Sequence, residues 1–142
     1  MSLERFLDAQ KVNYEIALSE IKGGKKYSHW IWYIFPQING LGYSPTSKYY
    51  AIKNKEEAIE YLKHPILSVR LLEITEELLK LDEDNISAIM GYLDDIKLKS
   101  SMTLFYLVSG NEVFKAVIDK YFDGELDTKT IAILNGNLKI NK

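Results

Sequence analysis

The chain has 142 residues, near the common size of one domain, and 46% of them are hydrophobic and 27% charged, which is typical of a folded protein and not of a disordered one. Its 18 basic and 20 acidic residues leave a formal net charge of −2. No basic excess is available to attract a phosphate backbone, so we expect no nucleic-acid partner, and the absence of cysteine excludes disulfides, thiol catalysis and cysteine-ligated metal sites.

The first segment predicts an amphipathic helix over residues 3–21. Apolar residues return at every third or fourth position, as one buried helical face requires, and Gly23-Gly24 is a natural end. Arg5 and Asp8 lie one turn apart, so we expect a salt bridge between them. The charged residues at the start are unlike a signal peptide, and no apolar stretch approaches the roughly 20 residues that span a bilayer. We therefore expect a cytoplasmic protein without a membrane partner.

Residues 28–37 form the most unusual segment, because they contain both tryptophans and one of the two histidines. We expect Ser28 to cap a short helix that ends before Pro36. Such a concentration of large rings is typical of a central core helix, and it is also typical of a ligand pocket. The two interpretations are compatible, because different faces of one helix can serve each purpose.

Residues 37–43 predict a loop, with Asn39-Gly40 and Gly42 as turn signals. Ser44-Pro45 then begins another helix, with serine as the cap and proline as the first helical residue. The spacing of the glycines matches neither nucleotide-binding fingerprint, so a turn between helices is favoured over a phosphate-binding loop.

Further helices are predicted downstream, and capping or breaking residues mark where they begin. These residues are Asn54, Pro65, Asn85, Asp94, Asn111 and Asp127. The stretch from Met102 to Val108 is apolar enough to form a buried strand instead. With no repeat, no linker and no alternating pattern, the sequence predicts an all-α fold. We expect one compact domain over residues 1–142 with about seven or eight helices, several of them short, and a polar, frayed tail from Asn135.

Residues 97–103 place lysines beside hydroxyl groups. On a helix these side chains lie within one turn of each other, where they can bind an anion or serve as base and nucleophile. Serines that bond their own backbone are the more common outcome. Because no third orienting group is identifiable, we assign no nucleophile, and Lys99, Ser100 and Ser101 remain candidates for anion binding.

Several motifs follow one another in a fixed order. They occupy residues 5–10, 28–37, 40–45, 50–52, 61–65 and 97–105. This series resembles the mainly bacterial family named domain of unknown function 1810, over nearly the whole chain, and its His-Trp-x-Trp and Phe-Pro-Gln elements are the most specific. The resemblance implies a compact helical domain and brings no settled activity. Some members carry the label calpastatin, a disordered protease inhibitor; the apolar content and helix caps of this chain exclude disorder, so we reject that label.

The leading functional hypothesis is a pocket for a small aromatic or anionic ligand around residues 28–45 and 97–103. The candidate ligand-binding residues are Trp30, Trp32, Tyr33, Gln37, Ser44, Lys99, Ser100 and Ser101. If the protein is an enzyme, His29 is the candidate general acid or base, because an imidazole titrates near neutral pH. With two histidines and no cysteine we expect no metal site, and no particular cofactor is indicated.

The alternative hypothesis is a non-enzymatic module that binds or regulates a partner protein. Such a module predicts an exposed apolar patch, whereas the first hypothesis predicts a concave pocket with polar groups in its wall.

Overall fold

The structure is a computed structural model that describes residues 3–136. All regular structure in that range is helical, so the predicted all-α fold is confirmed. In chain order the helices are α1 (Glu4–Lys22), α2 (Ile31–Ile34), α3 (Pro45–Tyr50), α4 (Lys55–Lys63), α5 (Leu67–Lys80), α6 (Ile86–Met90), α7 (Asp94–Ser109), α8 (Glu112–Tyr121) and α9 (Thr128–Leu134). Within the described range this is more than the predicted seven or eight, because several are very short. The predicted polar tail begins at Asn135. Its residues after Gly136 lie outside the described residues.

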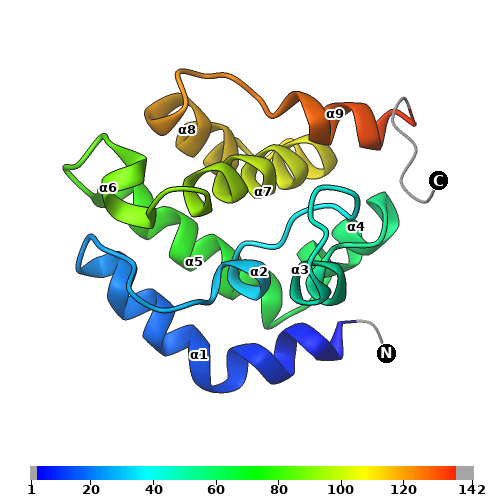
Figure 1. The fold of residues 1–142 in the computed structure, drawn as a ribbon, viewed down its shortest axis with the longest axis horizontal. Coiled ribbons are helices and arrows are strands. Elements are labelled where there is room, and N and C mark those ends of the chain that lie inside the picture. Colours follow the sequence, from blue (N-terminus) through cyan, green and yellow to red (C-terminus); the bar gives the residue numbers. More distant parts are fainter. Residues whose placement is uncertain (1–2, 137–142) are drawn as a thin grey trace.

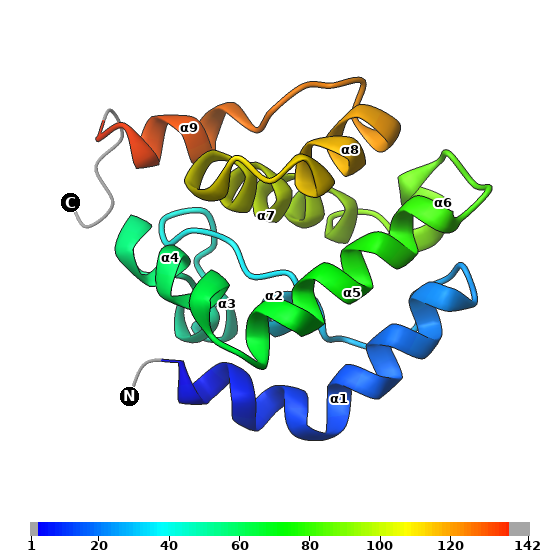
Figure 2. The same cartoon turned by 180° about the vertical axis from the view of Figure 1, so that it is seen from behind.

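The two helices α5 and α7 occupy the middle of the fold. On one side lies α1 and on the other lie α8 and α9 (Figures 1 and 2). Helix α5 contacts both α1 and α8, and α7 contacts α4, α6, α8 and α9. Among the described residues no helix is both long and apolar enough to cross a bilayer.

The stretch from Met102 to Val108, which was compatible with a buried strand, belongs to α7. The stretch is apolar because the helix is buried, and not because it is a strand in a sheet. Because α7 is enclosed by helices on several sides, Leu98, Leu104 and Phe105 are all completely buried. A helix enclosed in this way is apolar around most of its circumference.

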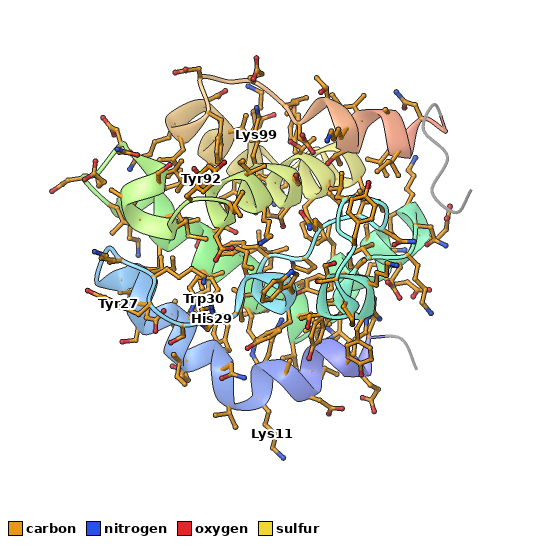
Figure 3. The ribbon with its side chains drawn as sticks, in the orientation of Figure 1. Lys11, Tyr27, His29, Trp30, Tyr92 and Lys99 are labelled. Carbon is orange, nitrogen blue, oxygen red and sulfur yellow. The ribbon has the colours of Figure 1, made fainter. Side chains whose placement is uncertain are left out.

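Most helices begin where the sequence predicted, because a side-chain oxygen accepts a hydrogen bond from a free backbone N–H group of the first turn. Such caps are present at Ser44, Asn54, Asn85, Asn111 and Asp127. The prediction of a cap at Ser28 is wrong. Helix α2 begins only after Trp30, which is labelled in Figure 3, and has no side-chain cap. The hydroxyl of Ser28 instead donates to Glu20 of α1, over 2.6 Å, which is a charge-assisted bond.

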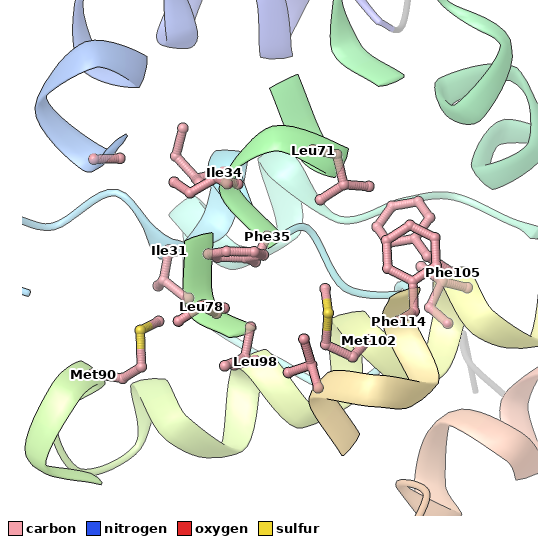
Figure 4. Close-up of a cluster of buried hydrophobic side chains, with 14 of the residues drawn as sticks. Ile31, Ile34, Phe35, Leu71, Leu78, Met90, Leu98, Met102, Phe105 and Phe114 are labelled. Carbon is pink, nitrogen blue, oxygen red and sulfur yellow. The ribbon is translucent and has the colours of Figure 1, made fainter. Parts of the chain in front are cut away.

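The short helix α2 supplies the centre of the core. Trp30, Ile31, Ile34 and Phe35 are each no more than 2% exposed. Figure 4 shows the last three of these side chains among residues of α5, α6 and α7. One part of the aromatic segment is therefore core.

A buried ion pair joins α1 to α4. Arg5 and Glu57 are only 8% and 5% exposed, and Nη2 of the guanidinium lies 2.7 Å from Oε1 of the carboxylate. Arg5 also donates to the backbone oxygen of Ala51 at 2.7 Å, and Glu57 accepts from the backbone N–H of Lys53 at 2.9 Å. The predicted partner of Arg5, Asp8, is exposed on α1, so that prediction is wrong. The side chain of Arg5 lies in the interior because it pairs there with the buried carboxylate of Glu57 on α4.

Candidate functional site

A cleft of about 340 Å³ opens beside α2, a volume within the range of small-ligand sites. Its walls come from α2, the loop of residues 37–44, the start of α3, the first half of α7 and the start of α9. The apolar part of the lining consists of Trp32, Leu41, Gly42, Tyr43, Leu93 and Ile96, and the polar part of Gln37, Ser44, Ser47, Lys97, Ser100, Asp127 and Lys129.

The cleft contains some of the residues that the sequence singled out. Trp32, Gln37, Ser44 and Ser100 all belong to its lining. The first three come from residues 28–45 and the last from α7, so the structure brings the two predicted segments to one concavity.

Other predicted residues lie elsewhere. The ring of Trp30 is in the core, and Ser101 is completely buried, with no hydrogen bond to its hydroxyl among the described residues. His29 is exposed in the connection between α1 and α2 (Figure 3), outside the cleft lining. Lys99 is engaged in an ion pair with Glu125, over 2.9 Å.

Tyr33 is half-buried on another side of α2. Its ring centroid lies 5.1 Å from that of Tyr50, and its backbone oxygen accepts a hydrogen bond from Gln10 at 2.7 Å. Burial, and then the neighbouring Tyr50, raise the pKa of the Tyr33 phenol. This residue holds α2 against α1 and α3 and does not line the cleft.

The carboxylate of Glu20 accepts several hydrogen bonds from the segment that leads into α2. Glu20 accepts hydrogen bonds from the backbone of Tyr27 and Ser28, at 2.9 and 3.0 Å, and from the indole N–H of Trp30 at 2.9 Å. Burial raises the pKa of Glu20, but the hydrogen bonds from Ser28, Tyr27 and Trp30 outweigh it and lower the pKa to about 2. The ionised form of Glu20 therefore fixes the backbone from which Trp32 projects.

We expect Glu20→Gln to destabilise the protein at neutral pH, by on the order of 2–3 kcal/mol. A carboxyl whose pKa falls on folding stabilises the native state above its unfolded pKa, and loses that contribution as the pH falls through its folded pKa. The difference between variant and wild type should therefore shrink as the pH falls from about 4.5 to about 2. Urea unfolding at several pH values measures it, and a difference that stays constant over this interval would contradict the assignment.

One wall of the cleft combines an indole with a lysine. Nζ of Lys97 lies 5.0 Å from the ring centroid of Trp32, within the range of a cation–π interaction. The same ammonium lies 3.2 Å from Oδ1 of Asp94, while Oδ2 of Asp94 lies 2.7 Å from Nζ of Lys26. Asp94 therefore fixes the position of Lys97. Because Asp94 is shared with Lys26, it neutralises the charge of Lys97 only in part.

Asp127, at the start of α9, organises another part of the lining. Oδ2 of its carboxylate accepts from the hydroxyl of Ser100 at 2.9 Å and from the backbone N–H of Thr130 at 3.3 Å, and its own N–H donates to the hydroxyl of Thr103 at 2.9 Å. These bonds cap α9 and tie it to α7. Ser100 is thus a hydroxyl in the cleft lining that is held by Asp127 and by the backbone oxygen of Ile96, the latter at 3.3 Å.

Several donors in the cleft have no protein acceptor. Among the described residues, no hydrogen bond is made by the indole N–H of Trp32 or by the side-chain amide of Gln37, and Lys129 has no ion pair. Two lysines face one aspartate in the lining. The cleft therefore presents more donors than acceptors and an excess of positive charge, which suits an oxygen-rich anion.

The loop that borders the cleft depends on a glycine. A Cβ atom at Gly42 would lie 2.5 Å from Oγ of Ser47, closer than such atoms can approach. Glycine is therefore required for the loop to lie against α3.

Leu93, Asp127 and Lys129 line the cleft although they lie outside the two predicted segments, residues 28–45 and 97–103. Tyr43 and Lys97 lie inside those segments and also line the cleft, but neither was among the predicted ligand-binding residues. Asp127 and Lys129 carried only the signals of a helix start, and no pattern links them to residues 28–45. Their contribution follows from the packing of α9 on α7. Within the described range no three His, Asp or Glu side chains gather as a metal site would require.

Comparison with known proteins gives a consistent picture of the family and the fold. A family model described as "Protein of unknown function (DUF1810)" matches residues 1–134. A solved structure, that of the conserved hypothetical protein Rv1873 from Mycobacterium tuberculosis, is similar with a TM-score of 0.92 and 42% sequence identity, over 94% of this chain and 96% of that one. A search of curated proteins finds no match.

Proposed function

Because the chain belongs to the DUF1810 family, described only as of unknown function, we propose a function from its own cleft: it binds a small anionic ligand that carries a planar ring. Trp32 is the wall against which the ring packs. Lys97 and Lys129 attract the anionic group, and Gln37 donates hydrogen bonds to its oxygens. The hydroxyl of Ser44 already donates to that of Ser47 at 3.1 Å, so Ser44 shapes the cleft wall. His29 has no part in this proposal, because it lies outside the cleft lining.

The observation that carries the proposal is the state of Trp32. A buried tryptophan usually gives its indole N–H to an acceptor, as Trp30 does to Glu20 at 2.9 Å. The partly exposed side chain of Trp32 lines the cleft, its N–H has no acceptor among the described residues and is accessible to solvent, and its ring lies beside the ammonium of Lys97. An anion with a ring would pair with both groups and cover the indole face.

The two tryptophans make a direct test available. In protein labelled with ¹⁵N at the indole, Trp30 and Trp32 give one N–H signal each, and Trp32→Phe assigns them. We expect phenyl phosphate and benzoate, at millimolar concentration, to shift the signal of Trp32 and to leave that of Trp30 in place. The buried indole of Trp30, held by Glu20, is therefore an internal control in the same molecule.

Further titrations separate the two parts of the ligand. Inorganic phosphate tests the charge alone and benzyl alcohol tests the ring alone, and both should bind more weakly than phenyl phosphate. If no ring-bearing anion moves the Trp32 signal at tens of millimolar, the proposal is wrong. Equal shifts of both signals would indicate a general change in the protein and would also count against it.

The exposure of the cleft rim favours a second candidate, a protein-binding module. Tyr43 and Tyr92 are 85% and 81% exposed, and Leu93 is 51% exposed. A protein partner would cover Tyr92 as well as the cleft, whereas a small ligand would leave it in water, since Tyr92 is not part of the lining. Under the small-ligand proposal, Tyr92→Ala leaves the dissociation constant of phenyl phosphate unchanged.

A further inference from the structure

Leu93 has a backbone conformation that leucine rarely adopts. At the residue before α7 its φ is 79° and its ψ is −42°. For a residue with a side chain, positive φ brings Cβ close to backbone oxygen, so this conformation is strained and is tolerated mainly by glycine. Only one other described residue besides the glycines has a positive φ, Asp123.

The strain persists because the chain is fixed directly after Leu93. Asp94 is bound on both of its oxygens, at 2.7 Å by the almost completely buried Lys26 and at 3.2 Å by Lys97. The backbone oxygen of Leu93 also accepts the N–H of Lys97 at 3.1 Å, as the first turn of α7 closes. Strained residues of this kind survive where their surroundings fix them, and they concentrate at binding sites.

The consequence of this conformation is an apolar wall at the cleft. Leu93 and Ile96 both belong to the lining, and both side chains are 51% exposed. Leu93 precedes the helix and Ile96 belongs to its first turn, and the lining of the cleft includes both. Leu93 is thus unfavourable for stability through its backbone, and about half of it is left in water, where a ligand can contact it.

We propose that Leu93 is a specificity-determining residue of the cleft. With Ile96 it packs against the ring of the ligand, so that the cleft selects a ring-bearing anion over a bare one. This inference rests on the proposed function and adds which residue recognises the apolar part of the ligand. The lysines bind the charged part and do not distinguish the two classes of anion.

The test compares Leu93→Ala with Leu93→Gly. Both variants lose the side chain, but only glycine relieves the strain. Without any ligand, we expect the thermal midpoint of Leu93→Gly to exceed that of Leu93→Ala by several degrees. At an ordinary position the order is the reverse, because glycine loses more conformational entropy on folding than alanine.

The binding measurement uses phenyl phosphate and inorganic phosphate with wild type and both variants. We expect the dissociation constant of phenyl phosphate to rise about fivefold in both variants, through lost apolar contact, and that of inorganic phosphate to remain the same. A merely structural role would change both constants together.

Each failure has its own signature. If wild type binds phenyl phosphate but Leu93→Ala does not lower its preference over inorganic phosphate, the role of Leu93 is overturned and the ligand cleft stands. If wild type binds no ring-bearing anion, the proposed function itself fails, and this inference with it. If Leu93→Ala is as stable as Leu93→Gly, the claim of strain is wrong.

Discussion

Glu57→Ala is expected to lower the free energy of unfolding by about 3–5 kcal/mol, because it leaves the guanidinium of Arg5 without its carboxylate in the interior. The two groups are 8% and 5% exposed and 2.7 Å apart. The same carboxylate also holds the backbone of Lys53, so the connection from α3 to α4 loosens as well. Urea unfolding followed by circular dichroism measures the change.

Two further variants control this experiment. Removing both charges, in an Arg5→Leu and Glu57→Leu double variant, should recover much of the lost stability, because apolar side chains of similar volume then replace both members of the buried pair. Lys80→Ala breaks an exposed ion pair with Glu77 and should leave the unfolding midpoint nearly unchanged. If Glu57→Ala is no more harmful than Lys80→Ala, the buried pair does not stabilise the fold.

Substitution of Trp30 should affect mainly stability, and substitution of Trp32 should affect mainly ligand binding. Trp30→Ala is expected to cost about 3–5 kcal/mol of stability, because it leaves a cavity in the core and removes a donor from Glu20. Trp32→Ala, at the cleft, is expected to cost only about 1–2 kcal/mol. The same substitution should weaken the binding of phenyl phosphate roughly tenfold, through the loss of the ring contact and of one hydrogen bond.

The matched control for binding is Trp30→Phe, which keeps a ring in the core. Its affinity for phenyl phosphate should equal that of wild type, although its thermal midpoint falls. Isothermal titration and thermal unfolding together give both quantities for each variant. If Trp32→Ala binds the probe as wild type does, the assignment of Trp32 to the ligand is wrong.

The sequence predicted the cleft residues of the segment 28–45 better than those of α7 and α9. Trp32, Gln37 and Ser44 lie close together in the chain, and their concentration was visible. Ser100 was selected from a separate segment, but nothing in the sequence joined it to the others. His29 and Trp30 belong to the same aromatic segment as Trp32 and yet lie outside the cleft. Both precede α2, where His29 is exposed and Trp30 is held in the core by Glu20.

The sequence by itself determined the helical class and most of the places where helices begin, because caps, glycines and apolar periodicity act within one or two turns. It could not decide the partner of Arg5, since a local partner at Asp8 and a distant one at Glu57 are distinguished only by burial. It could not reveal the strain at Leu93, which depends on ion pairs that Asp94 makes with Lys26 and Lys97. The cleft exists because α9 packs on α7 and places Asp127 and Lys129 in the same lining as Trp32 of α2, and only the tertiary structure determines such contacts between distant segments.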